Sequence, residues 1–146
     1  MMLEKIKEII KKNDLCVMAT VSEGIPHCSL MTYISDEDGH EIYMVSQRDS
    51  RKYLNLTKNP TVSLLIDTRE IKMGQKRGNL KALTIKGEFQ PIEDPRKKDS
   101  IRLQFMKYHI HLNDFLNDPE SDIFCIKLKS FQLLDGVKNK FIETIS

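Results

Sequence analysis

The sequence contains no tryptophan, only three cysteines, and a net charge of only +2. Cys16, Cys28 and Cys125 are odd in number and far apart within apolar segments. This fits neither a disulfide framework nor a Cys-x-x-Cys metal site, so we expect reduced thiols in the core. With 23 Lys and Arg against 21 Asp and Glu, the overall charge gives no reason to expect a nucleic-acid partner. Any anion-binding site must therefore come from a local arrangement of basic residues.

Long apolar runs are also absent. No segment approaches the roughly 18 apolar residues of a membrane span, and the N-terminal MMLEKIKEIIKKND lacks the apolar stretch of a signal peptide. We therefore expect a cytoplasmic protein with no membrane partner. Nucleophile-elbow, Walker and dinucleotide-binding glycine motifs are missing too, which argues against hydrolase and P-loop chemistry.

Changes of hydrophobic period divide the chain into short elements. Residues 2–12 have the pattern of an amphipathic helix, residues 50–58 that of a short helix ending at Asn59-Pro60, and residues 91–118 that of a helical region. Six segments have the residue pattern of β-strands: residues 15–21, 25–34, 41–46, 61–67, 80–89 and 122–134. At 146 residues the chain fits one domain, residues 1–146. Six strands in so short a chain bury their edges best in a closed barrel. We therefore predict a mainly β, α+β fold, a six-stranded antiparallel barrel with flanking helices.

Ser50-Arg51-Lys52 begins the predicted helix at residues 50–58 with two cations in its first turn. The free N–H groups and the helix dipole already make this end positive, so Asp or Glu is normally favoured there. A bound anion would account for the two cations, with Ser50, backbone donors and both side chains converging on it, and phosphate is the obvious candidate. Another interpretation stays open, because dipole effects are only about 0.3 to 1 kcal/mol. Asp49 or Ser50 would then merely cap the helix, with Arg51 and Lys52 in solvent.

The run SRKYLNLTKNPTVSLLID, preceded by GIPHCSLMTY and EIYMVS, resembles the pyridoxamine 5'-phosphate oxidase-like FMN-binding split barrels. The likeness covers residues 14–67, and the order of strands and helices agrees through about residue 135. It implies a split barrel that binds FMN, with the phosphate on Arg51 and Lys52 and with Ser50 in the same pocket. It also implies a homodimer with FMN between the subunits. The strands implied to line the flavin contribute His27, Cys28, Ser29, Leu30, Met31 and Thr32, together with Val45 and Ser46.

Departures from the family pattern narrow the expected function. The authentic oxidase carries an Arg where this chain has Cys28 and a Gln where it has Ala82. It also has an Arg-x-His pair near its C-terminus, which the ending LLDGVKNKFIETIS lacks. We therefore expect an FMN-dependent oxidoreductase acting on an unknown small substrate, with NAD(P)H as a candidate donor. No side chain is assigned as catalyst, because the flavin N5 transfers the hydride.

Three alternatives to this function stay open. One is a non-catalytic module that binds or senses flavin. Another is a split barrel that binds haem or a deazaflavin. The third binds single-stranded nucleic acid, although the near-neutral charge and the absence of Trp argue against it.

Three smaller features each have two interpretations. His27 either contacts the cofactor or is an ordinary surface imidazole. His109 and His111 form an H-x-H pair, but in a helix their side chains would diverge by about 200°, so we expect no metal there. A basic segment either attracts a phosphorylated substrate or NAD(P)H or is simply solvated; its cations are Arg69, Lys72, Lys76, Arg77 and Lys81.

Overall fold

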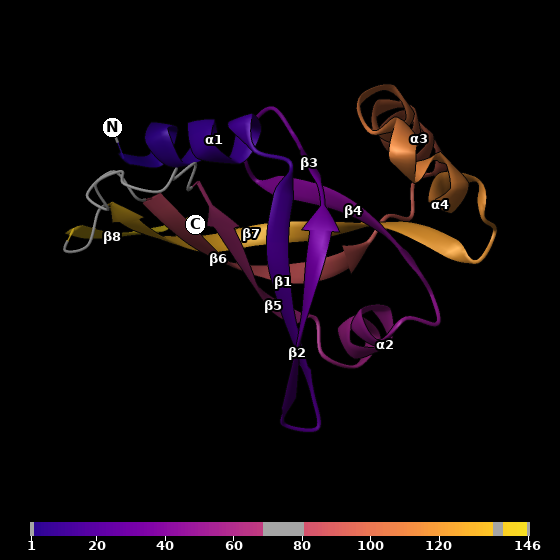
Figure 1. Ribbon diagram of the computed structural model, residues 1–146, viewed down its shortest axis with the longest axis horizontal. Coiled ribbons are helices and arrows are strands. Elements are labelled where there is room, and N and C mark those ends of the chain that lie inside the picture. Colours follow the sequence, from indigo (N-terminus) through magenta and orange to yellow (C-terminus); the bar gives the residue numbers. More distant parts are fainter. Residues whose placement is uncertain (1, 69–80, 136–138, 146) are drawn as a thin grey trace, which may run out of the picture.

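The computed structural model describes residues 2–68, 81–135 and 139–145 (Figure 1). These residues form a single eight-stranded sheet, four α-helices and a short 3-10 turn. The sheet is antiparallel throughout and curls into a half-barrel, so the predicted α+β split barrel is confirmed. The strand number differs from the predicted six, because β3 (Ile34–Ser35) and β8 (Asn139–Thr144) were not expected. No helix within the described ranges is long and apolar enough to cross a membrane.

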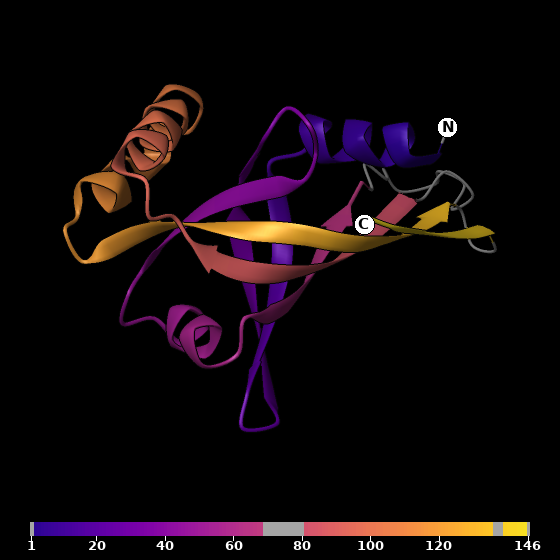
Figure 2. The ribbon, with the colours of Figure 1, turned by 180° about the vertical axis from the view of Figure 1, so that it is seen from behind.

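The sheet runs in the order β2-β1-β5-β6-β7-β4-β3, and β8 pairs with β7. β8 lies at the end of the molecule that carries both chain termini, far from α3 and α4 (Figures 1 and 2). The six longer strands are β1 (Leu15–Ser22), β2 (Ile25–Thr32), β4 (Glu41–Gln47), β5 (Thr61–Asp67), β6 (Lys81–Pro91) and β7 (Ser121–Asp135).

The closed barrel expected from the sequence is not observed, because the sheet order does not close and the barrel is open along one side. Among the described strands, β2 pairs only with β1. After Tyr33 the chain continues as β3, which pairs with the first half of β4 through Ile34 with Tyr43 and Ser35 with Ile42. The second half of β4 has no strand partner on that side within the described residues. We call the opening between β2 and the second half of β4 the split.

A tight hairpin joins β1 to β2. Glu23 and Gly24 both have positive φ, 54° and 75°, between the paired residues Ser22 and Ile25. Two such residues match the backbone of a two-residue turn that follows the right-handed twist of its strands. The hairpin extends beyond the rest of the sheet and ends near α2 (Figures 1 and 2).

The strands bury two apolar clusters, one on each face of β4. Ile42 and Met44 pack into the main core, which α1 (Met2–Lys12) covers at one end. Tyr43 and Val45 alternate to the other face and pack in a second core with residues of α3 (Pro95–Tyr108) and α4 (Asn113–Asn117). The β4–β7 pair is therefore covered on both faces.

Two expectations about single residues are wrong. Cys28 is exposed rather than buried, because β2 is an edge strand and the face carrying Cys28 and Leu30 is turned outward, whereas Cys16 and Cys125 are buried. The imidazoles of His109 and His111 do not diverge. α3 ends at Tyr108, and a 3-10 turn (Ile110–Leu112) brings the two ring centroids to 5.8 Å. Within the described residues no group of three or more His, Cys, Asp or Glu side chains could hold a metal ion.

Candidate functional site

The predicted helix start is confirmed at α2 (Arg51–Lys58), with Ser50 as its N-cap and Asn59 as its C-cap. The Ser50 hydroxyl accepts a hydrogen bond from the Tyr53 amide at 3.3 Å and donates to the Gln47 carbonyl at 2.8 Å. The first turn contains no acidic residue. The amides of Arg51 and Lys52 are the first two of the helix and have no acceptor within it. This end of α2 therefore presents two cations and two backbone donors.

The end of β4 contacts this helix start directly. The hydroxyl oxygens of Ser46 and Ser50 lie 2.8 Å apart, and Ser46 is 1% exposed. The neighbouring Val45 points to the other side of β4, into the core beneath α3 and α4. Of the two residues expected from β4, only Ser46 therefore brings its side chain to the helix start.

A pocket of about 300 Å³ lies between the β1–β2 hairpin and α2. It brings together His27 and Arg51, two residues expected at the site from separate segments. Lys58 adds a second cation, and Glu23 places a carboxylate on the hairpin side. The remaining lining residues are Ser22, Ile25, Pro26, Leu54 and Asn55. The pocket is thus a cationic recess with some apolar wall.

Asn55 is a site residue that the sequence interpretation missed. It is 4% exposed, and its side-chain amide donates to the Thr20 hydroxyl at 3.1 Å. That hydroxyl in turn donates to the main-chain carbonyl of His27 at 3.5 Å. The chain of contacts joins α2 to the hairpin across the pocket. Its only sequence signal is an Asn one helical turn after Arg51, and nothing local shows that this position is buried.

The other residues expected on β2 are distributed between its two faces. Met31 is 4% exposed and belongs to the main core. Leu30 is 70% exposed, Cys28 is also exposed, and Ser29 and Thr32 are half-buried. Lys52 is half-buried and does not line the pocket. A single subunit therefore leaves much of the expected flavin-lining strand in solvent.

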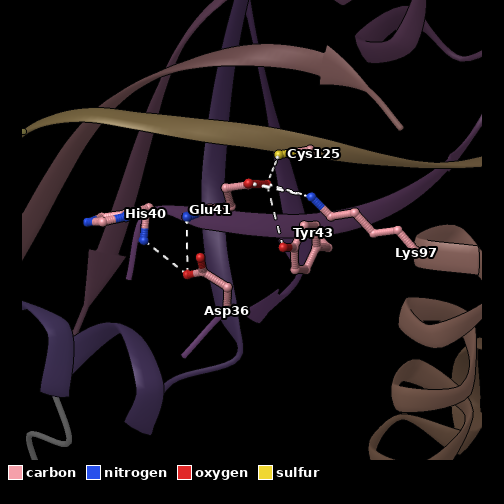
Figure 3. A network of polar contacts seen from close by, with 6 residues as sticks. All are labelled: Asp36, His40, Glu41, Tyr43, Lys97 and Cys125. Atoms are coloured by element: carbon pink, nitrogen blue, oxygen red, sulfur yellow. Dashed lines mark hydrogen bonds and ion pairs between the residues drawn. The ribbon is translucent and has the colours of Figure 1, made fainter. Parts of the chain in front are cut away.

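A second polar cluster, centred on Glu41, lies on the α3 side of β4 (Figure 3). One carboxylate oxygen of Glu41 accepts from the Cys125 thiol at 3.0 Å, from the Lys97 ammonium at 3.2 Å and from the Tyr43 hydroxyl at 3.5 Å. Burial by itself raises the pKa of Glu41, but the hydrogen bonds from Cys125 and Lys97 outweigh burial and lower it. Burial, and then the bond to Glu41, raise the pKa of the Cys125 thiol well above its usual range. The cluster thus pairs a charged carboxylate with a protonated thiol, and it contains none of the expected site residues.

Comparison with known proteins shows which family this chain matches. A sequence profile described as pyridoxamine 5'-phosphate oxidase matches residues 2–135. A pyridoxamine 5'-phosphate oxidase homolog from Schizosaccharomyces pombe is 24% identical over an alignment of 162 positions, which spans 90% of this chain and 84% of the relative.

Solved structures share the fold at low identity. A heme binding protein from Mycobacterium smegmatis has a TM-score of 0.82 at 15% identity, over 97% of this chain but 57% of that longer protein. A FAD-binding protein from Mesorhizobium loti has a TM-score of 0.69 at 18% identity, over 90% of each chain. The fold is therefore shared by flavin-binding and heme-binding proteins. The match over residues 2–135 shows that this chain belongs to the pyridoxamine 5'-phosphate oxidase family.

Proposed function

We propose that this protein binds FMN at the split and acts as an FMN-dependent oxidoreductase on a small substrate. The observation that carries the proposal is the start of α2, which presents Arg51 and Lys52 with no acid in its first turn beside the pocket that contains His27. We call Arg51, Lys52 and their two backbone amides the phosphate clamp. Cations and free helix N-terminal amides together suit a phosphate dianion.

The residues present fit both parts of the cofactor. The clamp suits the phosphate, and Ser50 supports it from behind as the N-cap rather than as a direct ligand. Ile25 and Leu54 supply apolar wall within the pocket, against which part of a planar ring could pack. A flavin site needs this combination of a cationic end, an apolar slot and a few polar groups at the ring edge.

We further propose that the protein is a homodimer with FMN at the subunit interface. The pocket of about 300 Å³ lies at the low end of the range for ligand sites, so one subunit provides only part of a flavin site. β2 is an edge strand that pairs on one side only, with β1, and its Ile25 and Leu30 are 68% and 70% exposed. Edges and apolar side chains of this kind are usually covered in a stable protein. A second copy would cover them and complete the site.

FMN, when bound, supplies hydride transfer at its ring. The contribution of the chain is to bind and orient it. Arg51 and Lys52 bind the phosphate, and the contacts from Asn55 through Thr20 to His27 keep helix and hairpin at a constant separation. A small substrate or NAD(P)H would then approach through the split. The basic segment was expected to attract this substrate or NAD(P)H. Its Lys81 is the first residue of β6. The other four cations lie outside the described residues: Arg69, Lys72, Lys76 and Arg77.

Titration of the purified protein with FMN tests the proposal. We expect saturable quenching of flavin fluorescence at one FMN per subunit and a dimer by analytical ultracentrifugation. Flavin fluorescence that stays unchanged up to high protein concentration would exclude the FMN site. Anaerobic mixing with NADH or NADPH then tests catalysis, because a non-catalytic module would leave bound FMN reduced no faster than free FMN.

Haem binding is a second candidate, favoured by one observation. The imidazole of His27 is exposed beside Arg51 and Lys58, which places a common iron ligand next to two cations that could pair with propionates. Titration with hemin tests it. A Soret band that appears with the wild type and is lost in His27→Ala would support haem, whereas a spectrum that matches free hemin would exclude it.

A further inference from the structure

A buried carboxylate contacts Tyr53, the residue that follows the phosphate clamp in the sequence. Asp122, near the start of β7, is 8% exposed and pairs across the sheet with Ser46. One of its oxygens accepts from the Tyr53 hydroxyl at 2.8 Å. The other accepts from the Lys98 ammonium at 2.8 Å and lies 3.6 Å from the Arg48 guanidinium. Asp122 thus connects α2, α3 and the loop between β4 and α2.

Tyr53 connects Asp122 to the start of α2. Its amide donates to the Ser50 cap, and its ring packs edge-on against Phe89 and Phe124, with centroids at 6.0 and 6.1 Å. Side chains on a helix are separated by about 100° per residue. Fixing the direction of Tyr53 therefore fixes the directions of Arg51 and Lys52 in the same turn.

We infer that Asp122 is a positioning residue for the cofactor, and that its hydrogen bond to Tyr53 aims the phosphate clamp. The inference rests on the proposed FMN site. Lys98 and Arg48 satisfy the carboxylate, so that Asp122 does not attract the clamp cations away from a ligand. Because the clamp contacts only the phosphate, Asp122 acts on affinity for FMN and leaves affinity for riboflavin unchanged.

The test compares Tyr53→Phe with the wild type in titrations with FMN and with riboflavin, which lacks the phosphate. We expect Tyr53→Phe to weaken FMN binding about three- to tenfold, the loss of one hydrogen bond to a charged group, and to leave riboflavin binding unchanged. The matched control is Tyr43→Phe, which removes a hydroxyl from the Glu41 cluster and should change neither affinity. The inference is overturned if the ratio of FMN affinity to riboflavin affinity is the same in Tyr53→Phe as in the wild type.

A second variant keeps the charge and changes only the geometry. Asp122→Glu moves the carboxylate oxygens away from Tyr53 and should lower the preference for FMN over riboflavin in the same direction. An unchanged preference in Asp122→Glu also counts against the inference. Failure of the proposed function is a different result, because the wild type itself would then show no preference for FMN over riboflavin.

Discussion

Two carboxylates on the β4–β7 pair bind neighbouring lysines of α3, yet they serve different parts of the molecule. Glu41 accepts from Lys97 at 3.2 Å and Asp122 accepts from Lys98 at 2.8 Å. The two carboxylates lie at opposite ends and on opposite faces of the pair, because Glu41 shares the face of Tyr43, whereas Asp122 lies across from Ser46.

The other partners of each carboxylate define the difference. Glu41 also contacts Cys125 and Tyr43, which lie under α3, so its network ends within the second core. Asp122 also contacts Tyr53, which belongs to the first turn of α2. Similar ion pairs therefore have different consequences. The pair of Glu41 with Lys97 only holds α3 against the sheet. The pair of Asp122 with Lys98 also holds α3, and Asp122 in addition orients the proposed clamp.

The largest expected contrast concerns the thiols. Burial raises the pKa of Cys16 to about 12, and Cys125 is buried with its thiol donating a hydrogen bond to Glu41, whereas Cys28 is exposed on β2. Because the thiolate is the reactive form, we expect iodoacetamide at pH 8 to leave Cys16 and Cys125 unmodified in the native protein, and to modify Cys28 only in the fraction that a second subunit does not cover. Mass spectrometry should find no native adduct on Cys16 or Cys125 and three adducts in denaturant. A native adduct on Cys125 would show that the Glu41 network opens readily.

The next contrast is in stability. Lys98→Met leaves the buried Asp122 with the more distant Arg48 as its remaining cationic partner, beside the Tyr53 hydroxyl, and we expect a loss of about 1 to 3 kcal/mol in the free energy of unfolding. Lys97→Met breaks a more exposed pair, with the lysine side chain 43% exposed, and should cost only about 0 to 1 kcal/mol. Urea denaturation of both variants measures the difference. Equal losses would show that the two carboxylates are equivalent anchors.

The smallest expected effect is in pH dependence. The native pKa of Glu41 is lowered from 4.5, so the stability that its network contributes is complete above about pH 4.5 and is lost as the pH falls through the lower native value. In Glu41→Gln the free energy of unfolding should therefore decline less steeply in this acidic range. Denaturation curves at several pH values below 5 provide the measurement, and parallel curves for variant and wild type would contradict the assignment.

Local patterns predicted much of this fold from the sequence. The helix at residues 51–58, with its cap at Ser50 and its stop at Asn59-Pro60, follows from turn chemistry within a few neighbours. Alternation along β2 places Met31 and Tyr33 on one face, but it does not show which face is outward, and so the exposure of Cys28 was missed. That depends on β2 being an edge strand, which is a property of the whole sheet.

The polar networks could not be predicted from the sequence for a related reason. Tyr53 and Asp122 are 69 positions apart, and Asn55 and Thr20 are 35 apart, so no local pattern connects them. Buried polar side chains need partners, but the sequence identifies neither which positions are buried nor which strands become neighbours. The clamp could be proposed from the sequence because its charges contradict the helix dipole within a single turn.

The phosphate clamp is the central claim, and its most direct test is the preference for FMN over riboflavin in the wild type and in the double variant Arg51→Ala/Lys52→Ala. We predict that the wild type binds FMN on the order of 100-fold more tightly than riboflavin, because two charge-assisted contacts act on the phosphate. The double variant should remain a folded dimer, bind riboflavin as before and lose most of that preference. A double variant that retains the wild-type preference would place the phosphate elsewhere and contradict the account.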